Sequence, residues 1–231
     1  MEDLVSIIMP VYNVNLEYLK MSIDSILEQT YQNFEFIIID DSSDSFCSNY
    51  LTTLDDPRIK YHRNSVNLGV TKSLNIGIEL SKGNYIIRMD ADDYSFPNRL
   101  SSQIKYISKN TATAVCGSIV RDLESNKIIY KYITHNMDEL KVLMLFGNYG
   151  VPHPTAIIDR KFIVDNQIKY DDRFTSSQDY KFWIDILLKD GAIILKNKAI
   201  LKYRKHQNQI TSSGKNSQIL NKHVIMRSIN Y

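Results

Sequence analysis

Glycine, proline and cysteine are all scarce in this sequence, and each scarcity excludes a class of protein. Only 8 of the 231 residues are glycine and 5 are proline, too few for a collagen-like or a low-complexity disordered chain. The two cysteines, Cys47 and Cys116, lie far apart and form no CxxC or Cys/His cluster, so neither a disulfide framework nor a zinc site is supported. Hydrophobic residues make up 43% of the chain, enough for a core, and we expect a globular protein.

A surplus of charge of one sign is also missing. The 28 Lys and Arg residues nearly balance the 26 Asp and Glu residues, which argues against nucleic acid as a partner, because binding a phosphate backbone needs a basic face. The apolar runs are far too short to span a bilayer, and the first residues, Met1-Glu2-Asp3, are acidic where a secretory signal is basic. We therefore expect a cytoplasmic protein, and peripheral contact with the inner face of the plasma membrane stays open.

Short apolar runs alternate with amphipathic stretches in the first half of the chain. The runs at residues 4–11, 34–39, 59–63, 85–89 and 114–120 are typical of buried strands. Apolar residues recur at spacings of three and four over 16–27, over 70–80 and after Pro97, which indicates helices. This alternation predicts an α/β domain with a mostly parallel sheet, which binds ligands beyond the carboxyl ends of its strands.

The second half is less regular. We expect an extended pair around 127–133, helices over 137–146 and 180–188, and strands over 155–158 and 192–203. No repeat or linker marks a domain boundary, so a single domain is expected. The basic tail at 215–227 is partly helical; a solvated helix is favoured there over a membrane-surface or subunit contact.

Acidic residues stand where a nucleotide-binding protein often carries glycines. The chain has no GxGxxG and no P-loop, but Asp40-Asp41 and Asp90-Ala91-Asp92-Asp93 each follow a predicted strand, with Asp44 close behind the first pair. Crowded carboxylates repel one another unless a cation neutralises them, and they favour Mg²⁺ or Mn²⁺, which commonly bridge to substrate phosphates. The pattern favours a metal and nucleotide site over the alternative of turn-forming acids that face water.

Two downstream residues fit the same site. Asp179 lies at the start of a predicted helix, where it is either a simple charge favoured by the helix dipole or a general base. His206 follows the last predicted strand; a lone histidine is usually a surface residue, yet an imidazole can complete a carboxylate metal site.

A series of motifs resembles, in order and spacing, those of the family-2 glycosyltransferases. The motifs are Val5-Ser6-Ile7-Ile8-Met9-Pro10-Val11-Tyr12-Asn13, Ser25-Ile26-Leu27-Glu28-Gln29-Thr30-Tyr31, Ile39-Asp40-Asp41-Ser42-Ser43-Asp44, Asn67-Leu68-Gly69, Leu74-Asn75-Ile76-Gly77, Gly83-Asn84-Tyr85-Ile86-Ile87-Arg88-Met89-Asp90-Ala91-Asp92-Asp93 and Pro97-Asn98-Arg99-Leu100. Later segments, His153-Pro154-Thr155, Gln178-Asp179 and Tyr203-Arg204-Lys205-His206, extend the resemblance almost to the end of the chain.

The resemblance implies a GT-A fold, Rossmann-like, over residues 1–213, followed by a basic helical tail at 214–231. Residues 1–120 would be the nucleotide-sugar half and 121–213 the acceptor half. It also implies an inverting transfer from a nucleotide-diphosphate sugar, with a preference for uridine, assisted by Mn²⁺ or Mg²⁺. The acceptor would be a hydroxyl of a saccharide or of a lipid-linked saccharide in cell-surface polysaccharide synthesis. A homo-oligomer stays open.

By the same resemblance, the nucleoside pocket would be lined by Pro10, Tyr12 and Asp41, with Tyr12 stacked on the base and Asp41 hydrogen-bonded to it. Lys72 would lie near the base or the diphosphate.

The metal and the base are placed by the resemblance as well. Asp92 would be the direct metal ligand, Asp90 would face the ribose and the metal, His206 would be a further metal ligand, and Asp179 would be the base. One departure is that Gln178 stands where the family usually has a glutamate, which removes an acid beside the base. Another is that Asp41-Ser42-Ser43 replaces the usual Asp-Asp-Gly-Ser turn.

Other functions remain open at this point. A sugar-1-phosphate nucleotidyltransferase would need a glycine- and arginine-rich loop near the N-terminus, and residues 5–13 contain neither residue type. A glycosidase also uses two carboxylates but needs no nucleotide pocket. A catalytically silent module that binds a sugar nucleotide is kept open by the Gln178 departure.

Overall fold

The computed structural model of the chain describes most of its residues. The described ranges are 2–43, 46–110, 112–132, 136–146, 150–174, 177–205, 221–222 and 224–226. In chain order their elements are β1 (Val5–Val11), α1 (Leu16–Leu27), β2 (Phe34–Asp40), α2 (Phe46–Leu51), β3 (Ile59–Arg63), α3 (Val70–Leu80), β4 (Tyr85–Arg88), β5 (Tyr94–Ser95), α4 (Arg99–Ile107), β6 (Ala114–Asp122), β7 (Ile128–Lys131), α5 (Met137–Leu145), the single-turn helix η1 (His153–Thr155), β8 (Ala156–Asp159), α6 (Arg160–Asp165), α7 (Gln178–Leu188) and β9 (Ile193–Tyr203).

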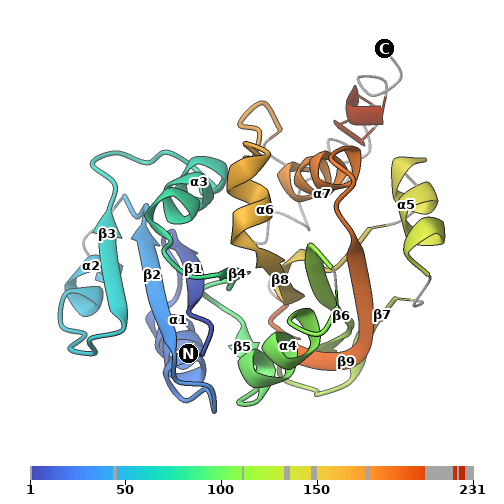
Figure 1. Cartoon of the computed structure of the whole chain (residues 1–231). Helices are drawn as coiled ribbons and strands as arrows, with labels where there is room; N and C mark the ends of the chain where they lie inside the picture. Colours follow the sequence, from blue (N-terminus) through green and yellow to red (C-terminus); the bar gives the residue numbers. More distant parts are fainter. Residues whose placement is uncertain are drawn as a thin grey trace.

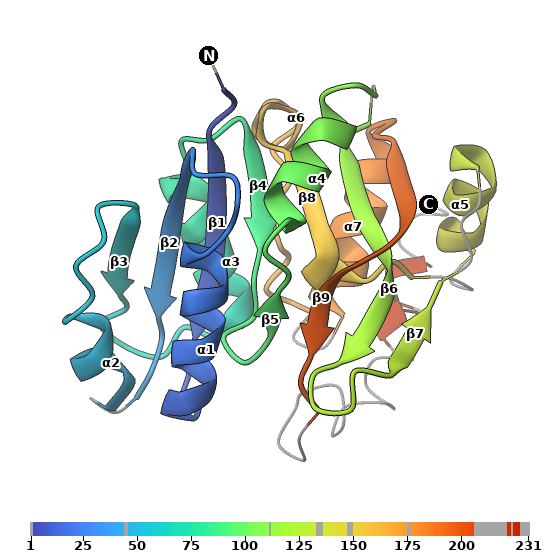
Figure 2. The ribbon, with the colours of Figure 1, turned by 90° about the horizontal axis from the view of Figure 1, so that it is seen from below.

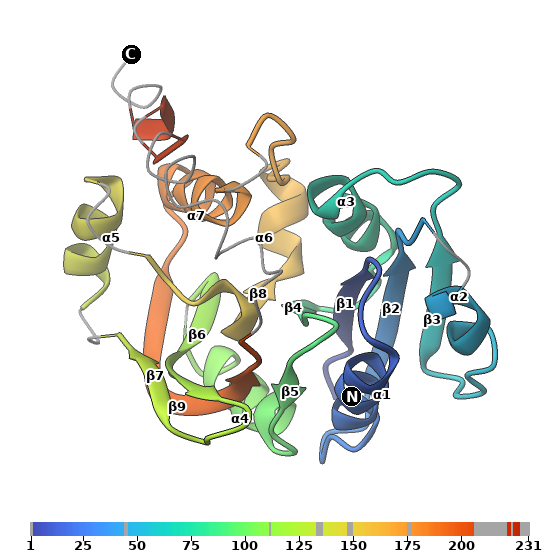
Figure 3. The same ribbon diagram turned by 180° about the vertical axis from the view of Figure 1, so that it is seen from behind.

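The strands form one mixed sheet between two layers of helices (Figure 1). Its order is β3-β2-β1-β4-β8-β6-β9-β5, with β7 paired to β6. Strand β1 pairs in parallel with β2 and β4, whereas β8 runs antiparallel to both β4 and β6. Helices α1 and α4 cover one face, and α3, α6 and α7 cover the other (Figures 2 and 3). The α/β fold expected from the sequence is confirmed, and antiparallel pairing enters with the second half.

An apolar cluster on each face of the sheet makes up the core. Ile23 of α1 and Leu100 of α4 belong to one cluster, and Leu74 of α3 and Trp183 of α7 belong to the other. Strand β2 is buried along its whole length, which is why its sequence reads as a continuous apolar run rather than an alternating one. Among the described residues, no helix has the length and apolar character needed to cross a membrane.

Most predicted elements agree with the structure, and the differences have local causes. The predicted helix over 70–80 is α3 and the predicted strand over 59–63 is β3. The helix expected to open at Pro97 begins at Arg99. Sequence analysis missed α2, α6 and β5, whose 6, 6 and 2 residues are too few to show a period.

The C-terminal tail departs from the solvated helix that its composition favoured. Where the structure describes it, at 221–222 and 224–226, the tail is helical. Ile225 is fully buried in the same apolar cluster as Met144 and Tyr180. The hydroxyl of Tyr180 lies 3.2 Å from the sulfur of Met226. This part of the tail therefore packs on α5 and α7.

A buried arginine ties the two halves of the sheet together. Arg99 has no exposed surface, and its Nη2 donates to the carbonyl oxygens of Arg88 (3.1 Å) and Pro154 (2.7 Å). Its Nε donates to Gln103 Oε1 at 3.2 Å, and the amide of Gln103 donates to the carbonyl of Thr155 at 2.8 Å. Burial lowers the pKa of Arg99 to about 10, so the side chain stays charged at neutral pH. The end of β4 and η1 are thus held by one cation.

Gly83, just before β4, provides a test of how closely this strand packs against the backbone at the start of β1. A Cβ atom there would lie 2.6 Å from the backbone nitrogen of Ser6 and 2.7 Å from the carbonyl oxygen of Leu4. We expect Gly83→Ala to lower the free energy of unfolding by about 1–3 kcal/mol, because the clash is with backbone that cannot move aside. Urea unfolding followed by circular dichroism measures this. Gly150→Ala is the matched control, since nothing lies within 4 Å of the added Cβ; equal midpoints for the two variants would contradict the packing.

Candidate active site

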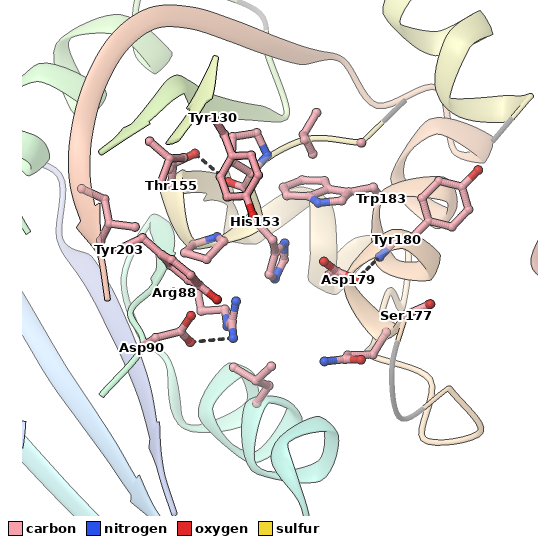
Figure 4. Close-up of a pocket in the computed structure, with 18 of the residues that line it drawn as sticks. Arg88, Asp90, Tyr130, His153, Thr155, Ser177, Asp179, Tyr180, Trp183 and Tyr203 are labelled. Carbon is pink, nitrogen blue, oxygen red and sulfur yellow. Dashed lines mark hydrogen bonds and ion pairs between the residues drawn. The ribbon is translucent and has the colours of Figure 1, made fainter. Parts of the chain in front are cut away.

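A cavity of about 430 Å³ lies beyond the end of β4 (Figure 4). Arg88 and Asp90 line it from β4 and the residues that follow, His153 from η1, and Asp179 and Trp183 from α7. The cavity therefore lies between Asp90-Ala91-Asp92-Asp93, which we call the DxD-like segment, and the first turns of α7. It is at the carboxyl end of a strand, where the sequence predicted the ligand site.

The Asp90 carboxylate is paired with the neighbouring strand residue. Arg88 Nη2 lies 2.5 Å from Asp90 Oδ1, and both side chains are largely covered. Burial raises the pKa of Asp90. The negative charges of Asp92 and Asp179 raise it further, and the Arg88 cation opposes this rise without cancelling it. Burial tends to lower the pKa of Arg88, but Asp90 and Asp179 outweigh it and raise this pKa. The guanidinium of Arg88 is therefore paired with Asp90, just after β4, and its pKa is also raised by the charge of Asp179 in α7.

The other two aspartates of the segment are fixed by the end of β9. Asp93 has no exposed surface, and its Oδ1 accepts from the backbone N–H of Arg204 at 3.0 Å. Its Oδ2 has no hydrogen-bond partner, and burial beside Asp90 and Asp92 holds its pKa well above the usual range. The Nε of Arg204 donates to the carbonyl of Asp92 at 3.1 Å, and its guanidinium lies 3.7 Å from the ring centre of Tyr18. Arg204 thus holds the segment in place.

The residues at this strand end fit a divalent ion only in company with a substrate. Within the described ranges, no three His, Cys, Asp or Glu side chains gather into a metal-binding group. Mg²⁺ is usually bound by one or two carboxylates and completed by substrate phosphates, so Asp90 and Asp92 suit it without a third protein ligand. Burial, together with the charges of Asp90 and Asp92, raises the pKa of the Asp93 carboxyl, and a cation bound nearby would oppose that rise. The predicted ligand His206 lies outside the described residues, as does Asp44.

The residues predicted for the nucleoside do not line this cavity. Pro10 pairs in register with Ile39 at the end of β1, Tyr12 is 57% exposed, and Lys72 is exposed on α3. These positions lie at the ends of neighbouring parallel strands and at the start of α3, beside the DxD-like segment. Their contacts with a nucleoside stay predictions.

Asp41 has a structural role that the sequence analysis missed. Its carboxylate accepts hydrogen bonds from the backbone N–H groups of Leu68 and Gly69, each at 2.8 Å, and from the side-chain amide of Asn64 at 2.7 Å. Gly69 adopts a φ of 83°, which favours glycine, and α3 begins at the next residue. The carboxylate of Asp41 therefore sets the start of α3.

Asp179 lies in the first turn of α7, on the wall opposite Asp90 (Figure 4). Its Oδ1 accepts from the backbone N–H of Tyr180 at 2.7 Å, as an acid favoured at a helix N-terminus does. The same carboxylate lines the cavity and raises the pKa of Arg88, so its position at the helix N-terminus is compatible with a role in the site. Beside it, the Oε1 atom of Gln178 is buried with no hydrogen-bond partner.

His153 forms the aromatic wall of the cavity together with Tyr170 and Trp183, and its ring also packs edge-on against Phe182. Its Nε2 lies 2.6 Å from the hydroxyl of Tyr170, and its ring centre lies 5.0 Å from that of Trp183. Asn75 of α3 fixes Tyr170 by exchanging two hydrogen bonds with its backbone, at 2.8 and 2.9 Å. Burial, reinforced by the Arg88 charge, holds the pKa of His153 well below its usual range. The imidazole is therefore neutral at physiological pH.

Several polar atoms of the cavity residues are buried without a partner. They are Arg88 Nε, His153 Nδ1, Gln178 Oε1 and Trp183 Nε1. A buried donor or acceptor left unsatisfied costs about 1–3 kcal/mol, so a native structure that gathers several of them in one place calls for an explanation.

Sequence reasoning brought out the acids of this site but not the residues between them. Asp90 and Asp179 were predicted, and the structure brings both to one cavity. Arg88 was quoted only within a motif, although an arginine inside an otherwise apolar strand is a signal in itself. His153 was also quoted only within a motif, and its pairing with Tyr170 has no signature in the sequence.

The fold and the cavity are compatible with a glycosyltransferase, and comparison with known proteins identifies the family. The sequence model of glycosyl transferase family 2 matches residues 6–167. A glycosyltransferase of Methanocaldococcus jannaschii is 33% identical over 210 residues, which cover 88% of this chain and 71% of the relative. The chain belongs to glycosyl transferase family 2. It is thereby a glycosyltransferase, rather than the nucleotidyltransferase or glycosidase that the sequence alone left open.

Two further known proteins are similar to this chain. The Escherichia coli protein WfgD, named UDP-Glc:alpha-D-GlcNAc-diphosphoundecaprenol beta-1,3-glucosyltransferase, is 32% identical over 216 residues, which cover 92% of this chain and 82% of WfgD. The crystal structure of S. aureus TarS 1-349 in complex with UDP-GlcNAc matches with a TM-score of 0.72 at 20% identity, over 90% of this chain and 60% of TarS. The chain thus spans less than two thirds of that TarS structure. The likeness confirms the predicted GT-A fold.

The neutral state of His153 gives a testable dependence of stability on pH. In the unfolded chain a histidine takes up a proton near pH 6.5, whereas burial prevents this in the folded protein. The stability contributed by neutral His153 is therefore complete above about pH 6.5 and is lost as the pH falls below it, by up to about 1.4 kcal/mol per pH unit.

Urea unfolding of the wild type and of His153→Phe between about pH 8 and pH 5 measures this contribution. The variant keeps an aromatic ring in the cluster but cannot titrate, so we expect its stability to fall less on acidification. Parallel curves for the two proteins would show that His153 is not held neutral.

Proposed function

We propose that the chain transfers a sugar, with inversion, from a UDP-sugar to a hydroxyl group of a saccharide or lipid-linked saccharide acceptor in cell-surface polysaccharide synthesis. The observation that carries the proposal is that Asp90, after β4, and Asp179, in α7, line one cavity together with Arg88. A single displacement at a sugar carbon requires a base for the acceptor hydroxyl and a means of neutralising the departing diphosphate, and Asp179 and the segment at Asp90 and Asp92 are candidates for these two roles.

The substrate classes are supported by relatives. The name of WfgD specifies UDP-Glc as donor and an undecaprenol-linked GlcNAc diphosphate as acceptor, and TarS was crystallised with UDP-GlcNAc. Tyr12, which the sequence resemblance assigns to the nucleoside, and Lys72, which it assigns to the base or the diphosphate, both have exposed side chains. A lipid-linked acceptor would bring the chain to a membrane surface.

The division of labour in the cavity follows from its charges. Asp179 accepts the proton of the acceptor hydroxyl as that oxygen attacks the anomeric carbon, and the sugar–phosphate bond breaks on the opposite side. Arg88, paired with Asp90, keeps positive charge in the same cavity. A divalent ion held by Asp92, with Asp90 beside it, would neutralise the charge that grows on the departing diphosphate. His153, held neutral, contributes hydrogen bonding rather than acid–base chemistry.

Asp179→Asn tests the base. We expect it to lower the rate of transfer by about 10²–10⁴-fold, because the amide cannot accept the proton, and to leave UDP binding intact. Release of UDP from UDP-glucose on addition of a GlcNAc-diphospholipid measures the rate, and calorimetry measures UDP binding. Asp185→Asn is the matched control: it lies on the same helix and pairs with Lys181, away from the cavity.

The outcomes of this experiment separate the remaining alternatives. Near-normal turnover by Asp179→Asn would show that another group is the base. Binding of UDP-sugars by the wild type without transfer to any acceptor tested would favour the silent sugar-nucleotide-binding module instead.

Asp92→Ala tests the metal. Loss of this carboxylate should weaken UDP-sugar binding at least about tenfold in the presence of Mn²⁺ and have little effect in the presence of a chelator, because the ion bridges the protein to the phosphates. Calorimetry under both conditions measures the difference. Asp172→Ala, at an exposed position outside the cavity, is the control. Equal affinity of Asp92→Ala and wild type with Mn²⁺ would contradict the assignment.

A further inference from the structure

Each unpartnered polar atom of the cavity can be assigned as a hydrogen-bond donor or acceptor. Burial raises the pKa of Tyr170, so its hydroxyl keeps its proton. The acceptor available to that proton is His153 Nε2, at 2.6 Å. Since His153 is neutral, its own proton then lies on Nδ1, which becomes a donor without an acceptor.

Among the buried side-chain atoms of the cavity residues that have no partner, donors outnumber acceptors. His153 Nδ1, Trp183 Nε1 and Arg88 Nε are all N–H groups, and Gln178 Oε1 is the unpartnered acceptor among the described cavity residues. Figure 4 shows His153, Trp183 and Asp179 around the same space. A ligand that satisfies this set needs an acceptor oxygen, next to it an N–H donor, and no negative charge of its own, because Asp90 and Asp179 already line the wall.

An acetamido group has this combination. Its carbonyl oxygen has two lone pairs for the N–H groups of His153 and Trp183, its N–H can donate to Gln178 Oε1, and its methyl group can pack against the aromatic wall. A hydroxyl group, by contrast, has a single proton and no methyl group. The position beside Asp179, the proposed base, places this group on the acceptor rather than on the donor.

We propose that His153, Trp183 and Gln178 form a subsite that selects a 2-acetamido sugar as the acceptor. The subsite rests on the proposed function, because it takes Asp179 as the base that an acceptor hydroxyl must reach. Tyr170 acts as a positioning residue, since its hydroxyl sets which nitrogen of His153 carries the proton.

Calorimetry on the whole chain with saturating UDP and Mn²⁺ tests the subsite. The probes are methyl 2-acetamido-2-deoxy-α-glucoside and methyl α-glucoside. We expect the acetamido sugar to bind at least about tenfold more tightly, which corresponds to one or two net hydrogen bonds. The fluorescence of Trp183, the one tryptophan in the sequence, gives a second readout.

Variants assign the preference to residues. His153→Phe and Gln178→Leu should each reduce it to about twofold or less while UDP affinity is unchanged, and Tyr170→Phe should reduce it partly. His62→Phe, the same change at an exposed position on β3, should keep it. Gln178 is only half-buried, so its variant remains informative if His153→Phe fails to fold.

The results distinguish this proposal from the proposed function. Equal binding of the two glycosides, no binding of either while UDP binds, or a preference that survives both variants would overturn the subsite alone. A preference found only between UDP-GlcNAc and UDP-glucose would move the acetamido contact to the donor and overturn the acceptor assignment. Failure to bind UDP or any UDP-sugar would refute the proposed function, and the subsite with it.

Discussion

The buried Arg99 cation is the interaction on which the arrangement of the site depends. Its guanidinium joins the last carbonyl of β4 to the carbonyl of Pro154, so the strand that carries Asp90 and the turn that carries His153 share one anchor. Among the described residues no carboxylate forms an ion pair with Arg99; its N–H groups donate to carbonyl and amide oxygens. Burial lowers its pKa to about 10, a fall that the charges of Asp93 and Asp90 oppose. A buried cation satisfied by backbone fixes backbone position, which a flexible surface ion pair does not.

Around that anchor, the acids of the chain have two different functions. Asp41 accepts a hydrogen bond from the backbone N–H of Gly69, and Asp93 accepts one from the backbone N–H of Arg204. Both aspartates thus join distant segments to the ends of strands. Asp90 and Asp179 face the cavity instead. Because residues of the first kind hold loops, residues of the second kind can be placed accurately without hydrogen-bonding to each other. Both kinds look alike in the sequence, as aspartates at the ends of predicted elements.

This explains how far the sequence could lead. The apolar runs that became β1, β2 and β4 and the period of α3 report local burial, so these elements were predictable. The acids after β4 were predictable as a site, because strand ends of a parallel sheet meet at one edge. The pairing of His153 with Tyr170 and the clamp of Arg204 on Asp93 were not, since each joins segments whose contact exists only after the chain has folded.

The replacement of the family's usual glutamate by Gln178 also has a physical meaning in this cavity. A second carboxylate beside Asp179 would add negative charge to a cavity that Asp90 also lines and in which the guanidinium of Arg88 is already paired with Asp90. A neutral amide avoids this repulsion and leaves Asp179 as the acid on that helix turn. The amide oxygen of Gln178 is a neutral hydrogen-bond acceptor, whereas a carboxylate oxygen at this position would be a charged one. In the proposed mechanism, the departure from the family pattern leaves Asp179 as the base, and in the proposed subsite it lets the neighbouring residue bind an N–H group.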